Sequence, residues 1–373
     1  MNELLIGVGD AGSAVEAIFV AAESEKKGIK TLWFADPEGK NGAIPLLKKK
    51  GIPFVADSPV EYANAIGWNR INGILVGVST TATNYQVEAT KAFREKGKKV
   101  LWLEDLPGSG SASKARSVSP DAMLVSVPLA SKIAEDARPG LQTIVINGMP
   151  SFGKLPALDE IPTIREKIRN ELKLSYTDFL VSVGFMGEPP EMAVSQLEMF
   201  LDNPPFDAIT RVAWRFHPKH PMAAELFEKA MSASSINSVD ARKADLLQLY
   251  LASDVVVVGW GGTDGYKALL RGTPVITMLF PMGEEDGRKY GYDDFPNRVA
   301  YGHPNGIPPI ISKDFVWGAG RTDRIFRLIN EVRRDASGIH RYTLNVRAES
   351  FRDFENPGAA ERAANEVMKF IFP

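Results

Sequence analysis

Short apolar runs alternate with stretches of helical periodicity along the first part of the chain. Strands that are apolar throughout and separated by helices are typical of a parallel sheet covered on both faces. The pattern therefore predicts a doubly wound α/β domain. Its expected strands lie at 4–8, 30–35, 53–55, 73–78, 99–103, 122–126 and 143–146, and helices are expected at 12–27, 42–50 and 82–96.

The same rhythm restarts after residues 148–156, which are rich in Gly and Pro and indicate a linker. A charged helix at 162–172 opens this second part, and an amphipathic helix at 359–370 ends the sequence. We therefore expect two Rossmann-like domains, 1–155 and 156–345, and a C-terminal segment, 346–373, that packs back on the first domain. The second domain's expected strands are 179–183, 211–216, 235–239, 254–258 and 274–278, and its helices 191–201, 223–231, 244–252 and 264–271.

Composition narrows the function classes. The length of 373 residues favours two domains, and a net charge of −2 argues against nucleic-acid binding. The absence of Cys excludes disulfides and thiolate catalysis, and the four His show no zinc-binding spacing, so we expect no metal site. The start of the chain lacks a signal-peptide layout, and no apolar run approaches the ~20 residues of a membrane span. These features predict a cytoplasmic protein.

A glycine-rich loop follows the first expected strand. Gly7, Gly9 and Gly12 form a Gly-x-Gly-x-x-Gly pattern, and Asp36 ends the next expected strand. Such a loop admits a pyrophosphate to a helix N-terminus, and the acid takes a ribose hydroxyl. An NAD-dependent oxidoreductase is therefore one hypothesis. Against it, any doubly wound domain needs a tight turn here, and Asp10 inside the loop suits a pyrophosphate poorly.

A second glycine-rich stretch runs from a buried strand through Gly259-Trp260-Gly261-Gly262-Thr263-Asp264 to a Gly272-Thr273-Pro274 turn. Its backbone N–H groups would face a phosphate. With this stretch the sequence resembles the glycosyltransferase B (GT-B) superfamily, which includes UDP-N-acetylglucosamine 2-epimerases. Phe216-His217-Pro218, the loop Gly184-Phe185-Met186-Gly187 and the segment 28–55 add to the resemblance.

The resemblance implies a metal-independent glycosyltransferase without a cofactor, whose partners are a nucleotide-sugar donor, such as a UDP-sugar, and an unknown acceptor. The domain 1–155 would hold the acceptor and the domain 156–345 the donor. The acceptor would contact Gly9, Gly12, Ser79 and Thr80, and the donor diphosphate would contact Gly184, His217, Gly261, Gly262, Thr263 and Asp264.

One residue departs from the GT-B pattern. Lys267 stands where many of these enzymes carry a Glu that binds the ribose, and a lysine cannot accept hydrogen bonds from ribose hydroxyls. Three alternatives therefore stay open. They are a transferase with an unusual donor, a sugar-nucleotide epimerase, and a non-catalytic protein that binds a nucleotide or sugar.

Three carboxylates follow expected strands and are catalytic candidates. Asp10 is a candidate general base for an acceptor hydroxyl, a role worth ~10²–10⁴-fold in rate; the alternative is an N-cap. Asp105, with Glu104, is a candidate base or acceptor ligand, or else part of a solvated turn. Ser79 and Thr80 are equally suited to capping a helix.

The lysine run Lys48-Lys49-Lys50 would suit a peripheral membrane contact or a helix end.

Overall fold

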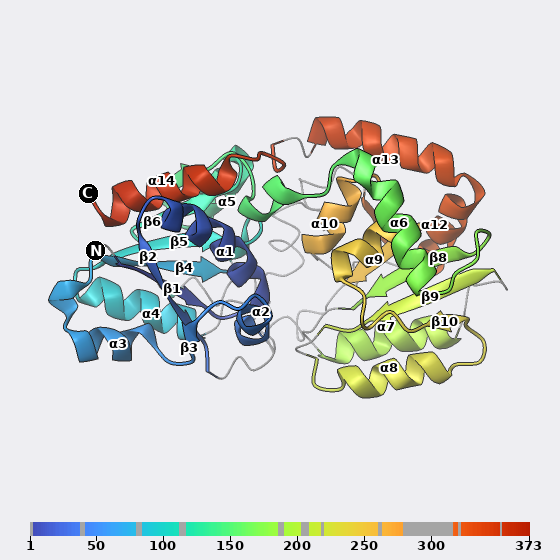
Figure 1. The fold of residues 1–373 in the computed structure, drawn as a ribbon, viewed down its shortest axis with the longest axis horizontal. Coiled ribbons are helices and arrows are strands. Elements are labelled where there is room, and N and C mark those ends of the chain that lie inside the picture. Colours follow the sequence, from blue (N-terminus) through green and yellow to red (C-terminus); the bar gives the residue numbers. More distant parts are fainter. Residues whose placement is uncertain are drawn as a thin grey trace. The chain divides into compact units, whose positions relative to one another are not determined.

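The chain divides into two compact units, which are described separately. In the computed structural model, unit 1 comprises the described residues within Met1–Lys154 and Asp353–Pro373, and unit 2 those within Leu155–Pro281 and Pro309–Arg352 (Figure 1). The structure describes residues 3–37, 42–79, 84–111, 117–185, 190–202, 209–217, 220–259, 263–278, 316–319, 322–350 and 353–373.

Unit 1 is built on a parallel sheet in the order β3-β2-β1-β4-β5-β6-β7. The strand order reverses between β1 and β4, because the chain adds β2 and β3 on one side and the later strands on the other. The strands are β1 (Glu3–Val8), β2 (Lys30–Ala35), β3 (Phe54–Val55), β4 (Gly73–Val78), β5 (Lys99–Glu104), β6 (Ala122–Val125) and β7 (Gln142–Val145).

Helices pack against this sheet, and the last of them is distant in sequence. α14 (Ala359–Ile371) lies against α1, and its buried side chains join the same core as those of β1 and α1. α3 (Pro59–Ile66) and α5 (Pro128–Ala137) were not predicted. Ser58 caps α3 and Pro59 occupies its first turn, a combination typical of a helix start. The other helices of unit 1 are α1 (Ala11–Lys26), α2 (Ala43–Lys49) and α4 (Asn84–Glu95).

The Gly- and Pro-rich stretch expected to be a linker is largely packed onto unit 1. Pro150–Lys154 form a 3-10 helix in which Pro150, Ser151 and Phe152 are buried. Glu16, in the middle of α1, accepts hydrogen bonds from the backbone N–H of Ser151 at 2.8 Å and from its hydroxyl at 2.5 Å. These contacts tie the stretch to α1.

Unit 2 contains a second parallel sheet, in the order β10-β9-β8-β11-β12-β13. Here the strand order reverses between β8 and β11. The two sheets confirm the predicted α/β class with two Rossmann-like halves. The strands are β8 (Phe179–Gly184), β9 (Thr210–Arg215), β10 (Ser238–Val239), β11 (Val255–Gly259), β12 (Val275–Met278) and β13 (Val316–Ala319).

The helices of unit 2 include two that were not predicted, α12 (Thr322–Arg334) and α13 (Ala336–Ser350). The buried residues Ile325, Leu328, Ile329 and Val332 of α12 have the spacing of one helix face, so the signal was present. None of the described helices is long and apolar enough to cross a membrane. The remaining helices are α6 (Ile161–Glu171), α7 (Pro190–Asp202), α8 (Ala223–Ser232), α9 (Leu246–Ala252) and α10 (Thr263–Leu269).

Candidate functional site

The carboxyl edge of the sheet in unit 1 gathers polar side chains from three adjacent strands. Asp10 lies just beyond β1, Ser79 directly after β4, and Glu104 and Asp105 at the end of β5. β1 and β4 are the strands between which the order reverses, and ligands of open α/β sheets bind in the crevice at such a point. Gly9 is buried in the same loop as Asp10. Thr80 lies outside the described residues.

Asp10 is the N-cap of α1. Its Oδ1 accepts a hydrogen bond from the backbone N–H of Ser13 at 2.9 Å, and its Oδ2 accepts one from the hydroxyl of Ser79. The capping alternative is therefore present in the structure. The same contacts hold the carboxylate in one orientation and attach Ser79 to it. The catalytic role of Asp10 stays a prediction.

Asp105 lies beside Asp10, and both approach Gly12 in the first turn of α1. A Cβ atom added at Gly12 would lie 2.5 Å from Oδ2 of Asp105 and 3.6 Å from Oδ1 of Asp10. A side chain at position 12 would therefore require the Asp105 carboxylate to move. Oδ1 of Asp105 is buried and has no hydrogen-bond partner among the described residues. Burial, and then the nearby charge of Asp10, raises the pKa of Asp105 well above its ordinary value.

Glu104 is a second buried carboxyl in this cluster. It accepts hydrogen bonds from the backbone N–H groups of Gly108 at 3.2 Å and Ser126 at 3.4 Å. Burial raises its pKa to about 8, although these two donors oppose the rise. The solvated-turn alternative is wrong for Glu104 and Asp105, which are only 4% and 7% exposed.

Such a cluster can exchange protons near neutral pH. Two neighbouring carboxyls with raised pKa values can hold one proton and one negative charge between them. We name Asp10, Ser79, Glu104 and Asp105 the carboxyl cluster. Among the described residues, no group of three acidic or His side chains is placed to hold a metal ion.

Sequence reasoning missed Glu16 as a partner of this region. Its carboxylate is buried in α1, and its charge contributes to the raised pKa of Asp105. The signal was an acidic residue among the other buried positions of the helix, which are Ser13, Ala14, Ala17, Val20, Ala21 and Ser24.

The carboxyl edge of the sheet in unit 2 carries the second set of predicted residues. Gly184 ends β8, His217 follows β9 by two residues, and Thr263 and Asp264 begin α10. A Cβ atom at Gly184 would collide with the hydroxyl of the buried Tyr250 in α9. Packing against Tyr250 therefore already requires a glycine at this position. Gly261 and Gly262 lie outside the described residues.

Arg215 is a cation at this edge that the sequence analysis did not single out. It ends β9, and its Nη1 donates to the carbonyl oxygens of Ala241 at 2.8 Å and Arg242 at 3.2 Å. Burial lowers the pKa of Arg215, and electrostatic interactions with Tyr250, Asp245, Asp264 and Asp240 oppose that change. The signal was an Arg at the last position of a largely buried strand, directly before Phe216-His217. Phe216 stacks on Phe185 with ring centroids 4.5 Å apart, which links the ends of β9 and β8.

Lys267, the residue that departs from the GT-B pattern, is 8% exposed and lies 3.4 Å from a carboxylate oxygen of Asp264. The positive charge of Lys267 therefore lies one turn into α10, beside Asp264, which the sequence predicts to contact the sugar donor.

In unit 1, Lys48 and Lys49 occupy the last turn of α2, where a cation is favoured by the helix dipole. Their contact with a membrane stays a prediction.

No protein-family model matches the sequence, and no curated protein matches it either. Solved structures do match over the whole chain. The Staphylococcus aureus MnaA–UDP structure aligns with a TM-score of 0.64 at 12% identity and covers 100% of this chain and 97% of its own. The UDP-GlcNAc 2-epimerase from Neisseria meningitidis, bound to UDP-GlcNAc, gives 0.60 at 13% identity and covers 98% of each chain.

The likeness extends to transferases. The glycosyltransferase SnogD from Streptomyces nogalater gives a TM-score of 0.58 at 14% identity and covers 99% of this chain and 100% of its own. Identities at this level establish the fold and leave the reaction to be argued from the residues. The predicted resemblance is confirmed at the level of architecture: this chain has the two-domain fold of GT-B glycosyltransferases and UDP-GlcNAc 2-epimerases.

Proposed function

We propose that this chain is a GT-B nucleotide-sugar enzyme, and specifically a metal-independent glycosyltransferase that moves a sugar from a nucleotide-sugar donor to an acceptor hydroxyl. The observation that carries the proposal is the carboxyl cluster at the strand-order reversal of unit 1. The fold likeness supports it, because two of the similar proteins were solved with UDP or UDP-GlcNAc.

Asp105 is the proposed base. When the acceptor oxygen bonds to the anomeric carbon, its proton passes to Oδ1 of Asp105, the oxygen without a described hydrogen-bond partner, and the bond to the leaving diphosphate breaks. A raised pKa makes this carboxylate a better proton acceptor than an exposed one. Asp10, fixed by Ser13 and Ser79, strengthens the base because its negative charge favours the protonated form of Asp105.

The donor diphosphate is proposed to bind at the carboxyl edge of unit 2. Arg215 and Lys267 supply positive charge there, beside the predicted contacts Gly184, His217 and Thr263. Preorganised cations and backbone N–H groups stabilise the charge that develops on a leaving diphosphate without a metal ion. The predicted Gly261 and Gly262 contacts belong to the same proposal.

A sugar-nucleotide epimerase is the second candidate, and Glu104 favours it. Inverting a carbon centre requires one group that removes a proton and another that returns one to the opposite face. Glu104, with a pKa of about 8, is largely protonated at neutral pH and can return a proton, and Asp105 is the proposed group that removes one. The carboxyl cluster therefore contains both an acid and a base.

Ligand-dependent thermal shifts test the shared part of the proposal. UDP, GDP, CDP, NAD and NADP are each added, because a ligand that binds only the folded state raises stability by about 2.7 kcal/mol at 100 times its Kd. We expect one nucleoside diphosphate to raise the melting temperature. A shift with NAD or NADP alone would overturn the nucleotide-sugar assignment in favour of a dehydrogenase.

Product analysis with the matching sugar nucleotide separates the two reactions. A transferase releases nucleoside diphosphate in proportion to added acceptor, whereas an epimerase converts the sugar nucleotide with no acceptor present. The variant Asp105→Asn serves as the control, since it should retain the thermal shift and form product ~10²–10⁴-fold more slowly. Binding without turnover under any condition would indicate a non-catalytic protein of this fold.

A further inference from the structure

A cavity of ≈ 430 Å³ opens on unit 2. Its volume lies within the roughly 300–1,000 Å³ typical of small-molecule sites. The cavity lies at the amino edge of the sheet, because two of its lining residues, Asp254 and Pro274, directly precede β11 and β12. The predicted donor contacts lie at the carboxyl edge. β11 has five residues, and at ~3.3 Å per residue the two edges are about 16 Å apart, so the cavity is separate from the proposed donor site.

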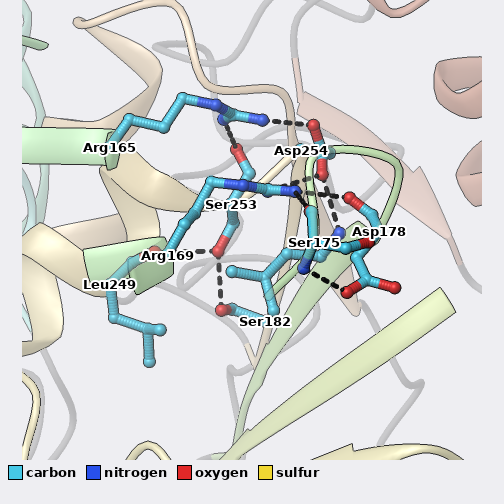
Figure 2. A network of polar contacts seen from close by, with 9 residues as sticks. Arg165, Arg169, Ser175, Asp178, Ser182, Leu249, Ser253 and Asp254 are labelled. Carbon is cyan, nitrogen blue, oxygen red and sulfur yellow. Dashed lines mark hydrogen bonds and ion pairs between the residues drawn. The ribbon is translucent and has the colours of Figure 1, made fainter. Parts of the chain in front are cut away.

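An ion-pair network forms one side of the cavity, and its members are bonded to one another. Arg165, which lines the cavity, donates to the carboxylate of Asp254 and to the backbone oxygen of Ser253 (Figure 2). Arg169 donates to the same carboxylate at 3.2 Å, and so does the backbone N–H of Leu180 at 2.7 Å. Figure 2 shows both guanidinium groups reaching Asp254. A charged ligand would have to lose its hydration and also displace one of these partners, which is costly.

Two further polar residues of the wall are also bonded within the protein. The guanidinium of Arg271 donates to the carbonyl oxygen of Pro156. The hydroxyl of Ser253 donates to the carbonyl oxygen of Leu249 at 2.8 Å and meets the hydroxyl of Ser182 at 2.7 Å (Figure 2). These contacts hold the wall of the cavity together and occupy the polar groups that make them.

The hydroxyl of Thr273 differs from these groups. Thr273 lines the cavity and is 4% exposed, and its hydroxyl makes no hydrogen bond within the part of the chain that the structure describes. A buried hydroxyl without a partner is unfavourable, and a molecule in the cavity can supply that partner. Because a hydroxyl both donates and accepts, an uncharged hydroxyl or carbonyl group is sufficient.

Much of the remaining wall is apolar. Leu158, three positions before Ile161 of α6, is 47% exposed. Covering such surface with an apolar molecule is favourable, so the wall suits an uncharged ring system. The apolar lining residues used here are Leu158, Ile161, Pro162, Leu251, Pro274 and Leu344.

We propose that this cavity binds a small uncharged organic molecule, whose apolar ring system lies between α6 and α13 and whose hydroxyl or carbonyl group hydrogen-bonds to Thr273. The proposal does not depend on the proposed donor site.

Calorimetric titration of the full chain with 1-naphthalenemethanol and 1-naphthoate at pH 8 tests the class of ligand. The two probes share a ring system, and the first carries an uncharged hydroxyl where the second carries a carboxylate. We expect 1-naphthalenemethanol to bind roughly 10-fold more tightly, since removing a carboxylate from water costs more than removing a hydroxyl. Equal or tighter binding of 1-naphthoate, or no binding of 1-naphthalenemethanol, would overturn the proposal.

A change at Thr273 tests the polar contact. Thr273→Val removes the hydroxyl and keeps the branched shape of the side chain, so the affinity for 1-naphthalenemethanol should fall roughly 3- to 10-fold. Thr177→Val is its control, because Thr177 is exposed and does not line the cavity, and this variant should leave the affinity unchanged. Unchanged affinity in a folded Thr273→Val would reject the contact with Thr273.

Leu158→Ala locates the probe independently and decides the matter if Thr273→Val fails to fold. The change removes an apolar contact at an exposed position, so the affinity should fall roughly 3-fold or more. Its matched control is Ile209→Ala, since Ile209 is an apolar residue of unit 2 that is 43% exposed and does not line the cavity. Equal affinities of Leu158→Ala and the wild type would place the probe elsewhere and reject the site.

Discussion

The hydroxyl of Ser79 donates a hydrogen bond to Oδ2 of Asp10, which joins the loops after β4 and β1 where the strand order of unit 1 reverses. Oδ1 of Asp10 is meanwhile used to cap α1. One carboxylate therefore connects a helix start with a neighbouring strand end and lies beside Asp105. Asp10 and Asp105, both catalytic candidates from the sequence, therefore differ in the structure. Asp10 is held by two donors, whereas Oδ1 of Asp105 has no described hydrogen-bond partner.

Replacing Asp105 by Asn should lower turnover by ~10²–10⁴-fold, the usual contribution of a general base. The change keeps the size of the side chain but removes its ability to accept a proton. Affinity for the nucleoside diphosphate should be unchanged, because that ligand is proposed to bind unit 2. Steady-state kinetics and calorimetry with UDP measure the two quantities. Turnover within twofold of the wild type would mean that the base lies elsewhere.

Replacing Asp10 by Asn should move the acid limb of the kcat/KM pH profile to lower pH. The negative charge of Asp10 raises the pKa of Asp105, so its removal favours the ionised base at lower pH. Asn caps a helix about as well as Asp, so the melting temperature should hardly change. Asp136→Asn is the control, since Asp136 is an exposed residue of α5 outside the carboxyl cluster. An unshifted limb in Asp10→Asn would show that Asp10 only caps α1.

Glu104 should make folding stability depend on pH. Its pKa of about 8 in the folded chain exceeds its ordinary 4.5, so the folded state binds this proton more tightly. The stabilisation is complete below pH 4.5 and is lost as pH rises to about 8, at up to about 1.4 kcal/mol per pH unit. Gln mimics the protonated acid, so Glu104→Gln should gain stability relative to the wild type across that range.

Urea unfolding at several pH values measures the difference in the free energy of unfolding between Glu104→Gln and the wild type. Glu135→Gln is the control, because Glu135 is an exposed residue whose pKa is lowered by Thr143 and Ser131. The contribution of Glu135 is present above its ordinary pKa and is lost only on acidification, so this control should show no trend between pH 5 and 8. A Glu104→Gln difference that is flat over the same interval would refute the raised pKa.

Gly184→Ala should destabilise the protein by roughly 1–3 kcal/mol, as overpacking of a filled core does, because its Cβ atom would meet the hydroxyl of Tyr250. Tyr250→Phe removes that hydroxyl, so the double variant should recover most of the loss. Thermal unfolding measures the recovery. Strictly additive effects would show that the two residues do not compete for space. UDP affinity in the stable double variant then tests whether Gly184 also contacts the donor.

The class of fold was predictable from the sequence because its evidence is local. A strand buried on both faces, such as β4 or β11, is apolar at almost every position, and the glycine turns and helix caps that follow are coded within a few residues. The expected positions of Asp10 and Glu104 at strand ends rest on the same local pattern. α3 and α12 were missed, although Ser58-Pro59 and the spacing of Ile325, Leu328, Ile329 and Val332 carried local signals of the same kind.

The chemistry of the carboxyl cluster depends on distances that no local pattern contains. Ser79 meets Asp10 from 69 positions away, and Ser151 meets Glu16 from 135 positions away. The cavity of unit 2 likewise depends on Arg165 and Asp254, which are 89 positions apart. Burial and neighbouring charge shift a pKa only after folding has excluded water and placed those neighbours. The sequence therefore reveals which side chains are candidates, and the packing of distant segments establishes which become buried acids and which become caps.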